Sequence, residues 1–265
     1  TMKFLIVSLA IFTNVASAAI QNVHPRNCTV GSQLSEEQLS RSEVYICGDY
    51  EERTPLYCVF YDTETSGLPL WDKPSDDPHQ PHIAAIAMLL TSETGVNRGG
   101  ANLLITPEGW TMPAEMEAIN GLTQSILEQF GVSWSIAADL FRAYANTAGL
   151  VIGHNIAFDQ RMMRIEHKRR HGEYEYEWIA KLPTFCTQLA ATDILKIPPT
   201  SKMMAAGIKR FKTPSLAECV QHFFGRSHEG GHTAMGDVIA TRAVYFEIVK
   251  RTMPGPKPAG DRQPT

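Results

Sequence analysis

Two carboxylates stand one residue apart at the end of an apolar segment, in the stretch VFYDTETSGL that spans 59–68. Side chains at positions i and i+2 of a strand point to the same face, so Asp62 and Glu64 are expected side by side. Such a pair stays ionised at neutral pH only where a cation lies between the two groups, since otherwise the pKa of one rises and it binds a proton. Mg²⁺ suits this position because it prefers oxygen ligands and keeps water or phosphate oxygens in its shell.

Two later segments offer further acidic and histidine side chains. Asp159 lies in VIGHNIAFDQRMM, in the first turn of a predicted helix, and His232 and Asp237 lie in GGHTAMGDVIATRAVYFEI, where the aspartate begins another helix. An aspartate at a helix start is often a cap or compensates the helix dipole. Taken singly, these residues can therefore have a purely structural role. The pair Asp62 and Glu64 can likewise be a solvated strand end.

The elements that must position these residues indicate an α/β fold. Three neighbouring strands precede an alternation of strands and helices, which is typical of an α/β protein with a mixed sheet. The stretch 69–82 contains four prolines and is predicted to be a loop, and 91–100 is predicted to be a turn. Strands are predicted at 56–61, 83–90, 101–105 and 150–152, helices at 133–148, 158–170, 215–224 and 233–249, a short helix within 112–123, and a strand edge followed by a helix within 184–195.

Composition sets few limits on function. The chain has 265 residues, which fits one large domain or one domain with an appendage, and its 43% hydrophobic and 20% charged residues are ordinary for a soluble globular protein. The net charge of −4 does not suggest a general polyanion binder. It does not exclude one either, because a cluster of catalytic carboxylates would make the sum negative and bound metal would reverse the local sign. The five cysteines form no CxxC pair, so no zinc site is expected.

The N-terminal region has the layout of an exported protein. Residues 2–18 combine one lysine, an apolar run and a small-residue cleavage site, and so resemble a signal peptide, while the run is too short for a membrane span. Residues 19–55 are predicted to be a polar extension. If the protein is exported, Cys28 and Cys47 are the natural disulfide, which would add about 3 kcal/mol in the chain-entropy model. If it is not, all cysteines are expected to be thiols.

The order of the three motifs carries a resemblance to a known family. DTETSG at 62–67, HNIAFD at 154–159 and HTAMGD at 232–237 resemble the motifs of the DnaQ-like (DEDDh) 3′–5′ exonucleases, in the RNase H-like superfamily. The resemblance covers roughly 56–250. It implies an RNase H-like mixed β-sheet flanked by α-helices, with an exonuclease domain at 56–251 and a disordered tail at 252–265. The chain departs from the family at Asn120, where a histidine is common, and in the long loop at 69–82.

The resemblance assigns a role to each acidic residue. Asp62, Glu64, Asp159 and Asp237 would bind two divalent metal ions, Mg²⁺ or Mn²⁺, about 4 Å apart. His232 would be the general base that deprotonates the attacking water, as histidine can near neutral pH. The implied activity is metal-dependent hydrolysis of phosphodiester bonds at the 3′ end of DNA or RNA, with release of 5′-mononucleotides.

Substrate contacts follow from the same resemblance. Leu68 is expected either to wedge against the terminal base or to pack the loop. His154 and Asn155 are expected to hold the local turn by hydrogen bonds more than to touch substrate. Two basic runs, 166–171 and 209–212, are candidates for phosphate contacts, although such runs are often merely solvated. The predicted substrate-binding residues are Thr65, Leu68, His154 and Asn155.

Two other functions remain open on the sequence. One is a catalytically inactive RNase H-like module that binds nucleic acid, and the other is a secreted metal phosphodiesterase for small nucleotides. The expected partners are a single-stranded 3′ end of DNA or RNA and a separate polymerase subunit, with no stable membrane span. The family favours a cytoplasmic location, whereas the leader favours a secreted or periplasmic one.

Overall fold

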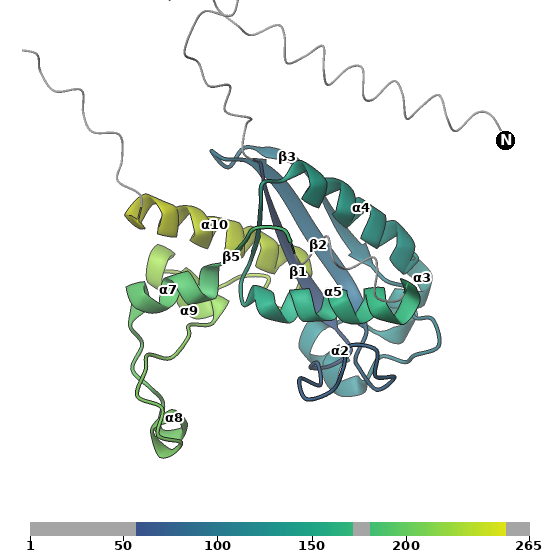
Figure 1. Ribbon diagram of the computed structural model, residues 1–265, viewed down its shortest axis with the longest axis horizontal. Coiled ribbons are helices and arrows are strands. Elements are labelled where there is room, and N and C mark those ends of the chain that lie inside the picture. The colour runs from purple at the N-terminus through teal and green to yellow at the C-terminus, as the bar shows by residue number, and fades with distance from the viewer. Residues whose placement is uncertain (1–56, 172–180, 253–265) are drawn as a thin grey trace, which may run out of the picture. The chain divides into compact units, whose positions relative to one another are not determined.

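Five strands form one mixed sheet in the computed structural model of the chain, which describes residues 57–171 and 181–252 (Figure 1). The strand order is β3-β2-β1-β4-β5. The central strand β1 runs antiparallel to β2 and parallel to β4, while β3 is antiparallel to β2 and β5 parallel to β4. The predicted α/β class is therefore confirmed. The strands are β1 (Tyr57–Thr65), β2 (Ile83–Ser92), β3 (Asn97–Leu104), β4 (Leu150–Gly153) and β5 (Thr184–Cys186).

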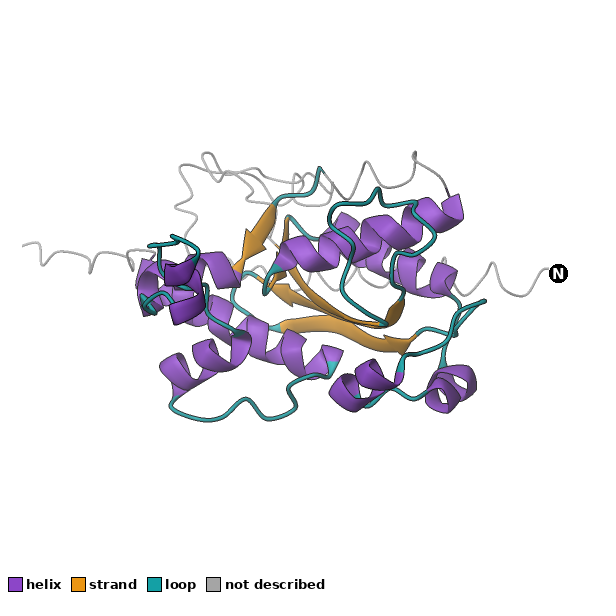
Figure 2. Cartoon of the chain, turned by 90° about the horizontal axis from the view of Figure 1, so that it is seen from below, coloured by secondary structure: helices purple, strands orange, loops and turns teal. Residues whose placement is uncertain are grey.

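Helices lie on both sides of this sheet (Figure 2). Their order along the chain is α2 (Ala114–Asn120), α3 (Gln124–Phe130), α4 (Trp134–Thr147), α5 (Ile156–His171), α7 (Thr187–Leu195), α8 (Ser201–Ala205), α9 (Leu216–Phe224) and α10 (Ala234–Thr252). The sequence did not predict α3 or α8. The prediction of a turn throughout 91–100 was wrong, because residues 97–100 pair with β2 and extend β3.

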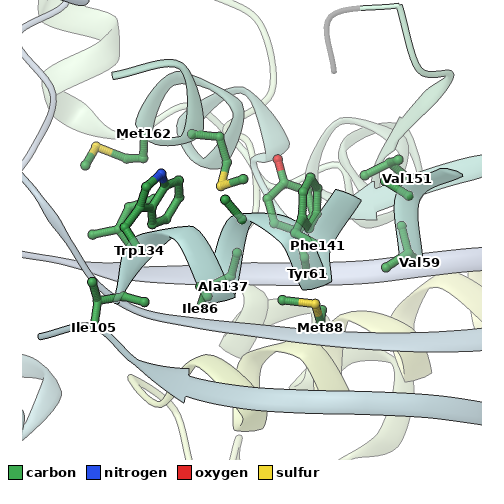
Figure 3. Close-up of a cluster of buried hydrophobic side chains, with 14 of the residues drawn as sticks. Val59, Tyr61, Ile86, Met88, Ile105, Trp134, Ala137, Phe141, Val151 and Met162 are labelled. Carbon is green, nitrogen blue, oxygen red and sulfur yellow. The ribbon is translucent and has the colours of Figure 1, made fainter. Parts of the chain in front are cut away.

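One face of the sheet packs against α4 and α5. Val59 and Tyr61 of β1 point into this layer, where Trp134 and Phe141 of α4 are fully buried. The ring centroids of Tyr61 and Phe141 lie 4.9 Å apart (Figure 3). Alternation along the strand therefore assigns the odd-numbered positions of β1 to the α4–α5 side.

The opposite face packs against α10. Cys58 and Phe60 of β1 contact the layer that contains Val238 and Tyr245. The even-numbered positions of β1 thus face α10. Because the strand continues to Thr65, well beyond its predicted end at 61, this alternation extends through the acidic pair.

The loop at 69–82 is tied to the domain by buried polar side chains. Gln80 is 2% exposed, and its side-chain amide both accepts from the N–H of Leu70 and donates to the carbonyl of Leu70, at 2.9 Å each. Arg161 of α5 donates to Ser75 Oγ at 2.7 Å, and Arg169 donates to the carbonyl of Gln80 at 2.7 Å. The predicted loop is therefore present as a fixed structure rather than a loose connection.

Glu166 is the centre of the polar network behind this loop. Its Oε1 accepts from the N–H of Ile83 at 3.1 Å and from Arg169 at 2.9 Å, and it lies 3.3 Å from His82 Nδ1. Burial alone would raise the pKa of this carboxyl, but the hydrogen bond with His82 and the charge of Arg169 outweigh burial and hold the pKa below its ordinary value. The network joins α5, the loop and the start of β2.

Several predictions fall on residues outside the described ranges. The leader at 2–18, the extension at 19–55, the pairing of Cys28 with Cys47 and nearly all of the tail belong to this group, and they stay predictions. Of the described cysteines, Cys58, Cys186 and Cys219 are free thiols. Within 57–171 and 181–252, no helix combines the length and the apolar character that crossing a bilayer requires.

We predict that Glu166→Ala lowers the free energy of unfolding by about 3–5 kcal/mol, because it leaves the buried N–H of Ile83 and the partly buried Arg169 without their acceptor. Glu108→Ala is the matched control, since Glu108 is exposed and its ion pair with Arg170 is expected to contribute less than about 1 kcal/mol. Urea unfolding of both variants measures the difference. Equal and small losses would contradict a stabilising network.

Candidate metal centre and active site

Three carboxylates converge where β1 meets the first turn of α10. Asp62 and Glu64 come from β1 and Asp237 from α10, and one oxygen of each lies within 4.8 Å of the other two. The alternation of β1 accounts for this meeting, because the even-numbered positions face α10. The structure therefore brings together three of the four acidic residues that the sequence singled out. Three oxygen ligands at this spacing can hold one hard divalent cation.

The electrostatics of this cluster favour a bound cation. Burial raises the pKa of Asp62 well above its usual value, and the neighbouring charges of Asp159, Asp237 and Glu64 raise it further. Burial and the charge of Asp237 raise the pKa of Glu64 to about 7. Without a cation, part of the cluster would bind protons at neutral pH, whereas a divalent ion would offset both the burial and the repulsion.

Asp159 approaches the same strand from the other side of the sheet. It lies in the first turn of α5 and is 2% exposed. Its Oδ1 accepts hydrogen bonds from the backbone N–H of Thr63 at 2.9 Å and from Thr63 Oγ1 at 2.7 Å. Burial raises the pKa of Asp159 to about 7, although the bonds from Thr63 act in the opposite direction. Asp159 thus holds the residue between the two β1 carboxylates and adds its charge to theirs, but it is not one of the three clustered ligands.

The loop before α10 presents His232 beside Asp237. His232 is exposed and has φ of 65°, a left-handed conformation that is uncommon outside glycine. Gly236 makes the tight turn possible, because a Cβ there would lie 2.2 Å from the carbonyl oxygen of Gly230. His232 and Asp237 line one cavity of about 720 Å³. His232, which the sequence analysis predicted to be the base, is therefore exposed in a cavity that one of the three carboxylates also lines.

His228 is a residue of this site that sequence reasoning missed. Its Nε2 lies 2.5 Å from Asp237 Oδ1, and it lines the same cavity as His232. The only signal in the sequence was a second histidine four residues before His232. A histidine on a carboxylate that binds metal fixes the orientation of that carboxylate, as partners of metal ligands commonly do.

The start of the loop after β1 is shaped by Thr65 and Asn120. Thr65 is buried and its Oγ1 donates to the carbonyl of Gly67 at 2.8 Å, while Leu68 is 77% exposed. Asn120, which stands where the sequence resemblance led us to expect a histidine, is 7% exposed. Its Nδ2 lies 3.5 Å from the carbonyl of Thr65, and its Oδ1 accepts from the N–H of Leu122 at 3.0 Å. Asn120 therefore supports the backbone of this loop.

The turn before α5 is held by His154. Its Nε2 lies 3.1 Å from the carbonyl oxygen of Pro214, to which it donates, and its Nδ1 lies 3.0 Å from Thr187 Oγ1. Burial lowers the pKa of His154 to about 4, so the ring is neutral at pH 7. Asn155 is exposed and has φ of 61°. Both ring nitrogens of His154 have protein partners, whereas Asn155 is open to solvent.

Comparison with known proteins shows a shared fold. Neither a family model nor a curated protein matches the chain. Solved structures of exonuclease I do match it. The zinc-bound complex of E. coli exonuclease I with single-stranded DNA gives a TM-score of 0.54 at 20% identity, over 75% of this chain and 41% of that chain. E. coli exonuclease I with a dA16 oligonucleotide gives 0.55 at 20% identity, over 74% and 41%. Exonuclease I with the inhibitor BCBP gives 0.56 at 18% identity, over 76% and 42%.

The chain therefore covers about two fifths of the length of these exonuclease I chains. At this level of identity the similarity establishes the fold, which is the mixed sheet flanked by helices described above. The predicted RNase H-like architecture agrees with it.

We predict that divalent metal binds more tightly as pH rises. Bound metal needs deprotonated ligands, and the pKa of Glu64 is raised to about 7. Between pH 6 and 8 the affinity for Mn²⁺ should therefore rise about tenfold for one such ligand. Calorimetric titration at both pH values measures this, and Asp139→Asn, an exposed residue of α4, is the control. A pH-independent affinity would contradict the ligand assignment.

The folding stability of the metal-free protein should fall as pH rises, whereas the metal affinity should rise. A carboxyl whose folded pKa is raised binds more protons in the folded than in the unfolded state, so stability falls as pH rises from about 4.5 to 7. Thermal unfolding in EDTA should follow this direction, and Mg²⁺ should remove the loss at pH 8. Glu64→Gln should flatten the metal-free pH dependence.

Proposed function

We propose that this protein is a metal-dependent 3′–5′ exonuclease that hydrolyses the terminal phosphodiester bond of a single-stranded nucleic acid. The observation that carries the proposal is the convergence of Asp62, Glu64 and Asp237 beside a cavity that His232 also lines. Four separate requirements meet there: oxygen ligands, negative charge, a base and space for a substrate.

The donor set fits a hard divalent cation. Asp62, Glu64 and Asp237 would hold one ion directly, and Asp159, whose charge already acts on Asp62, would contribute to a second ion. Such ions, when bound, stabilise the charge on the attacking and the leaving oxygens of a phosphodiester. Mg²⁺ or Mn²⁺ is proposed because all the ligands are carboxylates.

The residues around the ligands would carry the proton transfer. His232 would accept the proton of the attacking water at a ring nitrogen, since its side chain is exposed in the cavity that reaches Asp237. His228 would keep Asp237 oriented through its 2.5 Å contact. Thr63 would keep Asp159 oriented through its two hydrogen bonds. The left-handed backbone conformation of His232 costs conformational energy. Such strain occurs at functional sites, where it would serve here to orient the imidazole ring.

The exposed start of the loop after β1 would meet the 3′-terminal nucleotide. Leu68 is 77% exposed and lies four residues beyond Glu64, so a chain segment of at most about 14 Å separates their Cα atoms. Leu68 is proposed to contact the terminal base, and the backbone of Thr65 the terminal sugar. Asn155, exposed near the same end of the sheet, is a further candidate. The product would be a 5′-mononucleotide.

The similarity to exonuclease I supports this proposal through the fold, and two of those structures hold single-stranded DNA or a dA16 oligonucleotide. The chain matches only about two fifths of the length of those proteins.

The proposal is tested with 5′-labelled single-stranded DNA and RNA oligomers in the presence of Mg²⁺. Asp237→Asn should abolish stepwise shortening from the 3′ end. His232→Ala should lower the rate by about 10²–10⁴-fold while metal affinity stays near that of the wild type. Asp139→Asn removes the same charge from an exposed part of α4 and should leave the rate unchanged.

The alternatives give different results in the same assay. Tight binding of oligomers without metal-dependent turnover would indicate an inactive binding module. Turnover of small nucleotide diesters without turnover of oligomers would indicate a phosphodiesterase. An Asp237→Asn protein that shortened oligomers at the wild-type rate would overturn the proposal.

A further inference from the structure

A basic arm projects from the domain between α7 and α9. We define it as residues 196–213, which run outward from the end of α7 to α8 and then return (Figure 1). The two limbs meet at the base, where the N–H of Lys212 donates to the carbonyl of Ile197 at 2.9 Å. The arm contains five lysines and arginines and no aspartate or glutamate. A segment of this composition carries a strong local positive charge on a chain whose net charge is −4.

Two of the three cations of the returning limb are not neutralised by the rest of the described domain. Lys212 pairs with Glu218 at 2.5 Å, but within 57–171 and 181–252 neither Lys209 nor Arg210 forms an ion pair. Both side chains are exposed. Phe211 lies between these cations and the paired lysine and is 40% exposed. The exposed ring of Phe211 thus follows two unpaired cations in the chain.

A hollow lies between this limb and α7. It has a volume of about 360 Å³, with Lys209, Arg210 and Phe211 on the arm side and Leu189 and Asp193 on the α7 side. Leu189 is 63% exposed, so the hollow has apolar surface beside its cationic edge. Single-stranded nucleic acid presents the complementary surface, because its bases stack on aromatic and apolar groups while its phosphates pair with lysine and arginine.

The hollow and the cavity of the carboxylate site are lined by residues that are close in the chain. Thr213 lines the hollow, and Ser215 lines the cavity that contains His232 and Asp237. The Cα atoms of Thr213 and Ser215 are at most about 7 Å apart. Pro214, which separates them, is buried, and its carbonyl accepts hydrogen bonds from His154 and Gln188. The base of the arm is therefore fixed beside the proposed active site.

We propose that the basic arm binds the strand on the 5′ side of the nucleotide being removed. Lys209 and Arg210 pair with backbone phosphates, and Phe211 stacks on a base. This inference rests on the proposed function, because it places the 3′ end of the same strand at the carboxylates. It gives the chain its own means of holding a long substrate, since phosphate pairing does not depend on sequence. DNA and RNA both have the phosphates and the bases that the arm would contact.

The test compares long and short substrates in a double variant, Lys209→Gln with Arg210→Gln. For a 20-nucleotide single strand, KM should rise about tenfold, and the dependence of binding on salt should weaken by about 1.4 in the log–log slope, which corresponds to two lost phosphate contacts. For a dinucleotide, kcat/KM should not change, because it does not reach the arm. Phe211→Ala should weaken binding of the long strand by about fivefold or more with the salt slope unchanged.

A charge-matched control separates a local effect from a general one. Lys250→Gln with Arg251→Gln removes two cations from the end of α10, where both pair with Glu247, and should leave KM and the salt slope near those of the wild type. An unchanged KM in the arm variant, or an equal change in the control, would overturn the inference.

Failure of the proposed function gives a different pattern. In that case the wild type would hydrolyse neither substrate, while fluorescence anisotropy with the same 20-nucleotide strand would still measure binding to the arm. Loss of this binding in the double variant and not in the control would support the arm alone. Equal binding in all three proteins would reject it.

Discussion

Mutual repulsion among partly buried carboxylates is the constraint on which the rest of the structure depends. Asp62, Glu64 and Asp237 place oxygens within 4.8 Å of one another, and burial and neighbouring charge raise the pKa of both β1 carboxyls. Such an arrangement is unfavourable by itself and is maintained by the packing around it. The two core layers on either face of β1 fix the strand, and α10 brings the third carboxylate against it. The fold thus holds three carboxylates at a position where a bound cation would reduce their mutual repulsion.

The sequence predicted those features that depend on local pattern. Alternation in β1 placed Asp62 and Glu64 on one face, and the helix start placed Asp159 and Asp237 in first turns, as the structure has them. The α/β class followed from the order of elements. Several helix bounds agree within one to three residues, because proline, glycine and capping serine mark their ends. The assignment of catalytic and substrate-binding roles remains a prediction that the geometry supports but that only activity can test.

The features that the sequence did not predict depend on contacts between distant segments. Strand β3 begins at Asn97, within a stretch rich in turn-forming residues, because pairing with β2 outweighs local preference. His228 meets Asp237 only once the loop before α10 is folded. The side-chain amide of Gln80 fills the centre of a proline-rich loop. No local sequence pattern predicts this role of Gln80. The hollow beside the basic arm likewise needs α7 and the returning limb to be brought together.

Helix α5 serves two regions of the molecule at once. Near its start, Asp159 binds the strand between the two β1 carboxylates, and farther along, Arg161 and Arg169 hold the loop that leaves the same strand. Because one helix holds both the acidic strand and the loop that leaves it, the two are coupled in evolution. A homologue that lengthens or shortens this loop must change the matching positions of α5 as well, and a chimaera that exchanged one without the other would shift the loop relative to the carboxylate cluster.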